Sequence, residues 1–281
     1  SKRIDTIFGI EIKKDYINIS KIDHLEEGLQ LSLIKTVAIS TKATTEDSLI
    51  DVQVITELLS NALFGIEYEG AKVVVAVQDL NFFKQVCRYP VELKTEKLLD
   101  AISDEVASSI KFKEKEVQTA MAAVELESKI ISKNVPVLYA AIQKRLLDTL
   151  TEVFDILSMD LIDVDLVPLA ALRAATWNAS FLKASYLSVV IEEEYIDLNV
   201  VINGQILLTR TIRMNCVAVA EAKYMFDAVI QKMKQFNLAF CNMYPSIKFP
   251  DDALIYSRIE DRETVMKLFQ KRMEDEFKCR I

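Results

Sequence analysis

The only histidine of the chain is the first residue whose chemistry can be examined. His24 lies in a polar segment, residues 21–28, between two segments expected to be extended. A Ser-His-Asp triad would have to use this residue, and no G-x-S-x-G segment presents a serine for it. We therefore interpret His24 as a solvent-exposed residue of a hairpin.

The cysteines are too widely separated in the sequence to suggest a site. Cys87, Cys216, Cys241 and Cys279 form no C-x-x-C pair, the spacing typical of zinc sites. Most of them lie among apolar residues, where a cysteine usually packs as a small hydrophobic side chain. The pattern predicts neither a zinc site nor a disulfide framework, and it favours a reducing compartment.

Glycine is scarce, because the chain has five where average usage would give about 20. Loops that bind nucleotides use several glycines, since the backbone must approach a phosphate closely. The sequence contains no G-x-G, which argues against a Rossmann fingerprint and a kinase glycine loop. Residues 65–72 come nearest to a P-loop, but the lysine stands one place late and no Ser or Thr follows it. We interpret them as a helix C-cap and a turn.

Charge and hydrophobicity limit the class of protein. Of 281 residues, 34 are basic and 42 are acidic, which gives a net charge of -8, and 51% are hydrophobic. Such a chain folds into one large or two smaller domains. The acidic balance argues against a nucleic-acid partner, which needs a basic face. No apolar run reaches the roughly 18 residues of a membrane span and no signal peptide is recognised, so we expect a soluble, cytoplasmic protein without membrane insertion.

Hydrophobic patterns predict strands and helices in three blocks. The first is a three-stranded meander, a helix with Asp47 or Ser48 as its N-cap, and a buried strand. The second is strand, helix, strand, strand, which we interpret as an inserted subdomain. The third contains a meander whose last two strands are joined by Asn203-Gly204, a strong hairpin signal, and it ends in a helix. Strands are expected at residues 7–12, 16–22, 29–39, 72–77, 82–89, 117–126, 135–142, 161–166, 186–192, 195–202, 205–213 and 253–256.

This order of elements resembles the actin-like and sugar-kinase-like ATPases, which consist of two related halves. Residues 7–19 align by pattern with residues 187–199, which indicates an internal duplication. The insertion resembles the 1C subdomain of the FtsA branch, and the closer resemblance is to PilM-type proteins of type IV pilus assembly. It covers about residues 5 to 240 and is carried by the patterns of residues 73–77, 87–90, 137–141 and 163–174.

The resemblance implies an α/β fold: an actin-like (ribonuclease-H-like) duplicated fold with an inserted strand-helix-strand-strand 1C subdomain, SHS2-like, and a shortened second domain. The first actin-like domain, 1A, is expected at residues 1–80 and 143–183. The inserted 1C subdomain is expected at residues 81–142. The second domain, 2A with a reduced lid, is expected at residues 184–281.

The phosphate-binding positions of the family are altered in this chain. The first hairpin of the family carries D-I-G and the second D-x-G, and the matching residues here are Glu11, Ile12 and Lys13, then Glu192, Glu193 and Glu194. Carboxylates beside a nucleotide tail would repel it by roughly 1 kcal/mol or more per close pair. The glycine-rich adenosine segment has no counterpart. We therefore expect a non-hydrolysing protein with no cofactor, no metal and no catalytic residues, in which Glu11 and Glu192 are hairpin residues.

The resemblance also implies a partner. A PilM-like protein is peripheral to the inner membrane and holds the short cytoplasmic tail of a PilN-like bitopic membrane protein in a cleft beside 1C, where a sheet edge suits an extended peptide. A pilus motor ATPase, a platform protein and a second copy of the chain are further partners left open. The candidate contact residues, each of which could equally belong to a solvated loop, are Arg88, Tyr89, Lys111, Phe112 and Lys113.

Two alternatives stay open at this level. An active actin-like ATPase with ATP and Mg would need an acid near phosphate and metal, for which Glu11 with Asp163 or Asp165 is the candidate set. An FtsA-like, membrane-tethered filament protein would use the apolar face of the last helix. Basic residues on that helix are balanced by acidic ones, so its attraction to anionic lipid is weak, and we expect it to pack on the second domain's sheet. The apolar face consists of Val265, Leu268, Phe269, Met273 and Phe277.

Overall fold

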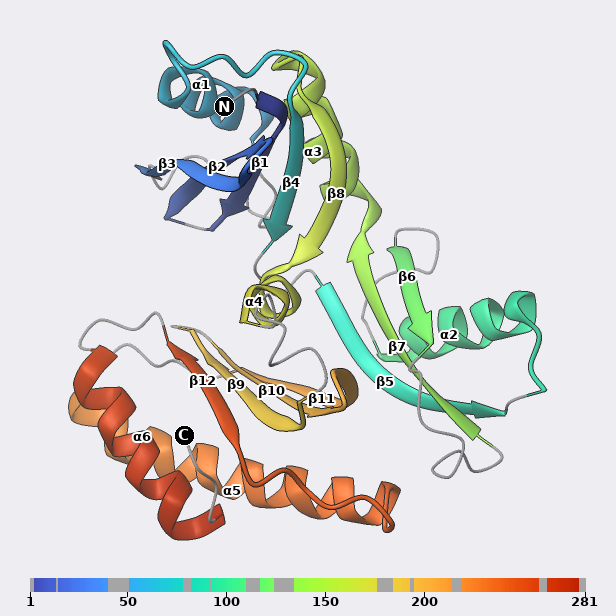
Figure 1. Ribbon diagram of the computed structural model, residues 1–281. Coiled ribbons are helices and arrows are strands. Elements are labelled where there is room, and N and C mark those ends of the chain that lie inside the picture. The colour runs from blue at the N-terminus through green and yellow to red at the C-terminus, as the bar shows by residue number, and fades with distance from the viewer. Residues whose placement is uncertain are drawn as a thin grey trace. The chain divides into compact units, whose positions relative to one another are not determined.

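The computed structural model describes residues 3–13, 15–39, 51–77, 82–90, 92–109, 117–123, 134–175, 184–192, 195–213, 219–257 and 262–277 (Figure 1). The chain divides into two compact units. One consists of residues 1–83, 106–118 and 141–170, and the other of residues 84–105, 119–140 and 171–281. The second unit thus holds much of the predicted insertion together with the predicted second domain. The domain boundaries expected from the sequence stay a prediction.

The first sheet has five strands in the order β3-β2-β1-β4-β8. Its first three strands form the predicted antiparallel meander, and the other two are parallel to β1. Because parallel strands run in the same direction, β1, β4 and β8 end at one edge of the sheet. The strands are β1 (Arg3–Ile12), β2 (Tyr16–Leu25), β3 (Gly28–Ala38), β4 (Lys72–Val77) and β8 (Asp160–Leu166).

Two helices of the first unit, α1 (Val52–Ala62) and α3 (Lys144–Ile156), pack against each other. The side chain of Asp51 caps α1 by accepting a hydrogen bond from the Val54 N–H at 3.1 Å. The predicted N-cap was therefore wrong: Asp47 and Ser48 lie outside the described residues, and the helix begins after Asp51. The polar run before the helix offers several capping residues, and only backbone geometry decides among them. The short helix α4 (Val167–Ala175) follows β8.

The second sheet repeats the first with four strands in the order β11-β10-β9-β12. Its three-stranded meander is antiparallel, and β12 is parallel to β9 as β4 is to β1. This shared topology confirms the predicted duplication. Asn203 and Gly204 join two of the strands with φ of 52° and 77°, as the hairpin signal predicted. The elements are β9 (Tyr186–Ile191), β10 (Tyr195–Ile202), β11 (Gln205–Arg213), α5 (Val219–Met243), β12 (Ala253–Ser257) and α6 (Arg262–Phe277).

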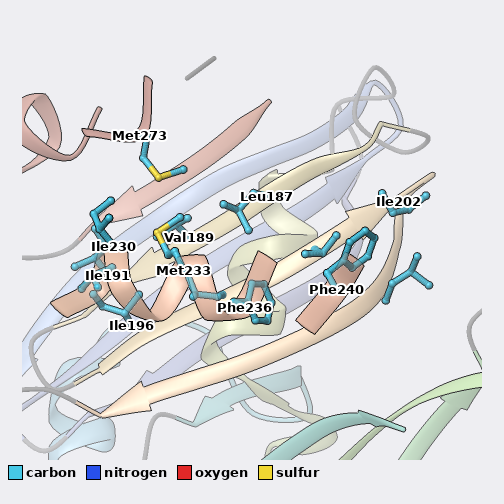
Figure 2. Packing of buried hydrophobic residues seen from close by; sticks show 14 of the residues in the cluster. Leu187, Val189, Ile191, Ile196, Ile202, Ile230, Met233, Phe236, Phe240 and Met273 are labelled. Atoms are coloured by element: carbon cyan, nitrogen blue, oxygen red, sulfur yellow. The ribbon is translucent and has the colours of Figure 1, made fainter. Parts of the chain in front are cut away.

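The core of the second sheet lies between its strands and the helices α5 and α6 (Figures 1 and 2). Alternate residues of β9 and β10 point into it and meet Met233, Phe236 and Phe240 of α5. Full burial of such side chains stabilises the fold by about 1.5–3 kcal/mol each. Met273 of α6 is also completely buried there, which confirms that the last helix packs on this part of the protein.

The predicted insertion forms a three-stranded sheet in the order β5-β7-β6. Its elements follow the predicted order strand, helix, strand, strand, and residues 124–126 of the third expected segment lie outside the described residues. They are β5 (Phe82–Pro90), α2 (Thr95–Ser109), β6 (Val117–Ala123) and β7 (Asn134–Gln143). Its strand β5 carries two of the candidate residues for partner binding, Arg88 and Tyr89.

Candidate functional site

The first hairpin holds Glu11 with groups from its own sheet. The Glu11 side chain points away from the buried face of β1, yet only 9% of the residue is exposed. Asn18 Nδ2 donates a hydrogen bond to Glu11 Oε2 at 2.8 Å, and Thr36 Oγ1 donates to Asn18 Oδ1 at 2.7 Å. The Lys13 ammonium lies 4.0 Å from Glu11 Oε1. These contacts form a polar row across β1, β2 and β3 that satisfies the carboxylate internally.

The turn of the same hairpin is closed by a backbone hydrogen bond. The Lys13 N–H donates to the Tyr16 carbonyl oxygen at 2.9 Å and closes the hairpin. The Lys13 ammonium lies over the Tyr16 ring, 5.3 Å from its centroid.

The second hairpin has the same closing bond, from the Glu192 N–H to the Tyr195 carbonyl oxygen at 2.9 Å. In the paired strands, Ile191 faces Ile196 as Ile12 faces Ile17. Glu192 therefore corresponds to Lys13, and the alignment of residues 7–19 with 187–199 was wrong by one residue.

The register also changes which side chain takes the acidic position of the second hairpin. Val190, not Glu192, corresponds to Glu11, so the match of Glu192, Glu193 and Glu194 to Glu11, Ile12 and Lys13 was wrong by two residues. The error arose because a run of three glutamates and the similar apolar alternation fit more than one register. Glu192 itself is completely buried. Glu193 and Glu194 lie outside the described residues.

Two acids of the ATPase alternative, Glu11 and Asp165, lie on one face of the first sheet. Glu11 is paired with Ala76 of β4, and Ala76 is paired with Asp165 of β8, so both acids point to the same face near the ends of the parallel strands. They stand two strands apart, about 10 Å by the usual spacing. Asp163 is paired with Val74, two positions before Ala76, and is exposed. Among the described residues, no group of three or more His, Cys, Asp or Glu side chains could hold a metal ion.

Sequence reasoning missed a buried ion pair on the second sheet. The Lys84 ammonium lies 2.7 Å from Asp197 Oδ1, and both side chains are completely buried. By the hairpin register, Asp197 is the counterpart of Asn18. The available signal was a lysine inside an apolar strand segment and two polar residues, Asp197 and Asn199, alternating through the apolar β10. Neither pattern names its partner, which lies more than a hundred residues away.

The candidate residues for partner binding have contacts within the chain. Arg88 Nη1 donates to the Met243 carbonyl oxygen at 2.9 Å, and its guanidinium lies 5.3 Å from the centroid of the Tyr244 ring. The Tyr89 hydroxyl donates to Glu105 Oε2 at 2.6 Å. Their role in binding stays a prediction. Lys111, Phe112 and Lys113 lie outside the described residues.

The five-stranded sheet and the four-stranded sheet share one arrangement, in which an antiparallel meander is followed by a strand parallel to the first strand of the meander. This repeated arrangement defines an actin-like α/β fold. A chain of the PilM–PilN type IV pilus biogenesis complex is similar to this one, with 15% sequence identity and a TM-score of 0.69 over 99% of this chain and 87% of that chain. A protein of Bacteroides thetaiotaomicron with an actin-like ATPase fold has 14% identity and a TM-score of 0.55 over 95% of this chain and 88% of that chain. The predicted actin-like, PilM-like fold is thereby confirmed.

Comparison of the sequence with known families and proteins finds no relative of this chain. No protein-family profile matches the chain, and no curated protein matches it. Within the described residues, every helix is too short or too polar to cross a membrane. The likeness to solved structures therefore shows the fold of the chain.

Proposed function

We propose that this protein is a cytoplasmic scaffold of a type IV pilus or a related secretion machinery, peripheral to the inner membrane, and that it binds the short cytoplasmic tail of a PilN-like membrane protein. The observation that carries the proposal is the likeness to a chain of the PilM–PilN complex over nearly the whole length of this chain. A scaffold of this kind needs a stable fold and a peptide-binding surface, and it needs no reacting groups.

The phosphate-binding positions support a scaffold that does not hydrolyse ATP. The Glu11 carboxylate is occupied by Asn18 and lies near Lys13, and Val190 takes the acidic position of the second hairpin. The N–H groups of Lys13 and Glu192 are both used to close their hairpins. A nucleotide would have to break these contacts before it gained its own, which lowers its affinity by the free energy of each bond lost.

Calorimetric titration with Mg-ATP tests the absence of nucleotide binding. We expect no heat of binding at micromolar protein. The active ATPase is the second candidate, because Glu11 and Asp165 share one face at the ends of the parallel strands. Micromolar affinity, together with ATP turnover that falls in Glu11→Gln, would establish this candidate and remove the proposal of a non-hydrolysing scaffold.

Partner binding is tested separately, with a synthetic peptide. The probe is the cytoplasmic tail of a single-span membrane protein encoded beside this chain, bound to the fluorescently labelled full chain. We expect saturable binding that weakens in Phe112→Ala. A scrambled peptide of the same composition is the control. Loss of binding with the scrambled peptide alone supports sequence-specific recognition. Equal binding of both peptides, or of neither, would contradict the proposed partner.

The structure disfavours the FtsA-like alternative at the last helix. Arg272 Nη2 of α6 lies 2.7 Å from Asp227 Oδ1 of α5, and Lys234 Nζ of α5 lies 2.5 Å from Glu276 Oε2 of α6. With Met273 buried beneath them, these ion pairs fix α6 on α5. We expect no co-sedimentation of the full chain with vesicles of anionic lipid, and salt-dependent co-sedimentation would revive the membrane tether.

A further inference from the structure

The strand β5 has two faces with different partners. Successive side chains of a strand point to opposite sides, so Gln85, Cys87 and Tyr89 share one face. All three contact the Glu105 carboxylate of α2, at 3.4, 2.9 and 2.6 Å respectively. The opposite face carries Lys84 and Arg88, which contact the second sheet and the end of α5.

The Lys84 ammonium is enclosed by acceptors from β10 and β11. Asp197 Oδ1 and Oδ2 lie 2.7 and 2.9 Å away, Asn199 Oδ1 lies 3.2 Å away, and the Thr209 hydroxyl also contacts it. The acceptors are themselves bonded together. Asn199 Nδ2 donates to Asp197 Oδ2 at 2.8 Å, and Thr211 Oγ1 donates to Asp197 Oδ1 at 2.7 Å. Both charges are thus satisfied without contact with solvent.

Burial makes this contact hard to break. Desolvation lowers the pKa of Lys84, while the Asp197 carboxylate favours its charged form. A buried charge whose partner is removed carries a large penalty, because water no longer solvates it. If β5 moved away from β10, Lys84 and Asp197 would each face this penalty unless water entered. The two charges are therefore both paired only while β5 stays packed against β10.

Arg88 supplies a second attachment on the same face of β5. Its guanidinium donates to the carbonyl oxygen of Met243, the last residue of α5, and stacks near the Tyr244 ring. A cation at the carboxyl end of a helix interacts favourably with the helix dipole. Val86, between the two attachments, is buried. Two side chains of this face, those of Lys84 and Arg88, are thus attached to the second sheet and to the end of α5.

We propose that β5 is a strap that joins the inserted sheet to the second sheet as one rigid body, with the Lys84–Asp197 pair as its lock. α2 is held on one face of the strap by Glu105, and the second sheet is held on the other. A partner that moves the inserted sheet must therefore move the second sheet with it. The strap does not depend on which partner the protein binds, so its failure would leave the proposed scaffold untouched.

Hydrogen exchange of the full chain, read by mass spectrometry, tests the strap. In Lys84→Met, we expect amides of residues 84–105 and of β10 and β11 to exchange faster together, by about a hundredfold, while β1 and β2 are unchanged. The matched control is Lys72→Met, which removes a lysine from the partly exposed pair with Asp5. This control should leave the exchange of residues 84–105, β10 and β11 unchanged.

Two further variants keep the test informative if Lys84→Met does not fold. Thr209→Val removes one hydroxyl from the Lys84 site with little change in shape, and we expect about tenfold faster exchange in both β5 and β10. The double variant Lys84→Met with Asp197→Leu replaces the pair by apolar side chains, and it should restore protection in both strands. Faster exchange in β10 alone, with β5 unchanged, would overturn the strap, whether it is seen in Lys84→Met or in Thr209→Val. Exchange in the double variant as fast as in Lys84→Met would also overturn it.

Discussion

At the scale of single residues, the thiol of Cys87 is held by groups from three elements. It donates to Glu105 Oε1 of α2 at 2.9 Å, accepts from Gln85 Nε2 of β5 at 3.1 Å, and lies 3.9 Å from the Tyr139 hydroxyl of β7. Burial, followed by the Glu105 carboxylate, raises the pKa of the Cys87 thiol to about 12. Because the thiolate is the nucleophile, this environment makes the thiol unreactive.

We predict that iodoacetamide alkylates Cys87 about a thousandfold more slowly at pH 8 than a thiol at its ordinary pKa of 9.0. Cys241 is exposed and serves as the internal reference, read peptide by peptide in a mass spectrometer. Glu105→Gln, which keeps the shape but removes the charge, should speed the reaction of Cys87 only in part, because burial is the larger cause. Labelling of Cys87 as fast as Cys241 in the unaltered chain would contradict this assignment.

The pair of Asp5 and Lys72 gives a second prediction, on pH. Lys72 Nζ lies 2.6 Å from Asp5 Oδ2, and this hydrogen bond is the main cause that lowers the pKa of Asp5 below its ordinary 3.8. A lowered carboxyl pKa stabilises the fold above pH 3.8, and this contribution is lost as the pH falls through the folded-state pKa. Carboxyl NMR titration should therefore show a midpoint below 3.8, which returns toward 3.8 in Lys72→Met. An unchanged midpoint in the variant would assign the shift to another group.

At the scale of elements, the cap of α1 is the clearest local determinant. Asp51 has an extended backbone and accepts the Val54 N–H, so we predict that Asp51→Ala lowers the free energy of unfolding by about 1 kcal/mol. Asp51→Asn keeps the acceptor and should be nearly neutral. Urea denaturation followed by circular dichroism measures both. Equal losses in the two variants would show that charge, and not the cap bond, stabilises the helix.

The same elements show what the sequence could and could not predict. The order of strands and helices followed from hydrophobic periodicity, and the Asn203-Gly204 turn followed from backbone preference, because both signals are local. The register of the second hairpin could not be predicted, since residues 189–191 are all apolar and a shift of one residue leaves the same apolar pattern. The contact of Lys84 with Asp197 could not be predicted, because only the folded chain brings together strands so distant in sequence.

At the scale of the whole molecule, the two sheets share a topology but differ in how deeply their strands are buried. Every residue of β9 and β10 is buried, whereas most residues of β3, at the edge of the first sheet, are exposed. Apolar side chains are among the exposed ones: Ile34 of β3 is 74% exposed. A strand that is covered on both faces opens only with a large part of its unit, and an edge strand opens by itself.

We predict that native-state hydrogen exchange separates these strands. The amides of β9 and β10 should exchange most slowly, close to the limit set by global unfolding, and the outward amides of β3 should exchange faster by a factor on the order of a thousand. A dilution series provides the control, since pairing of β3 with a second copy would protect it only at high protein concentration. Protection of β3 equal to that of β10 at every dilution would contradict the picture of an open edge, because an edge strand has no partner for half of its amides.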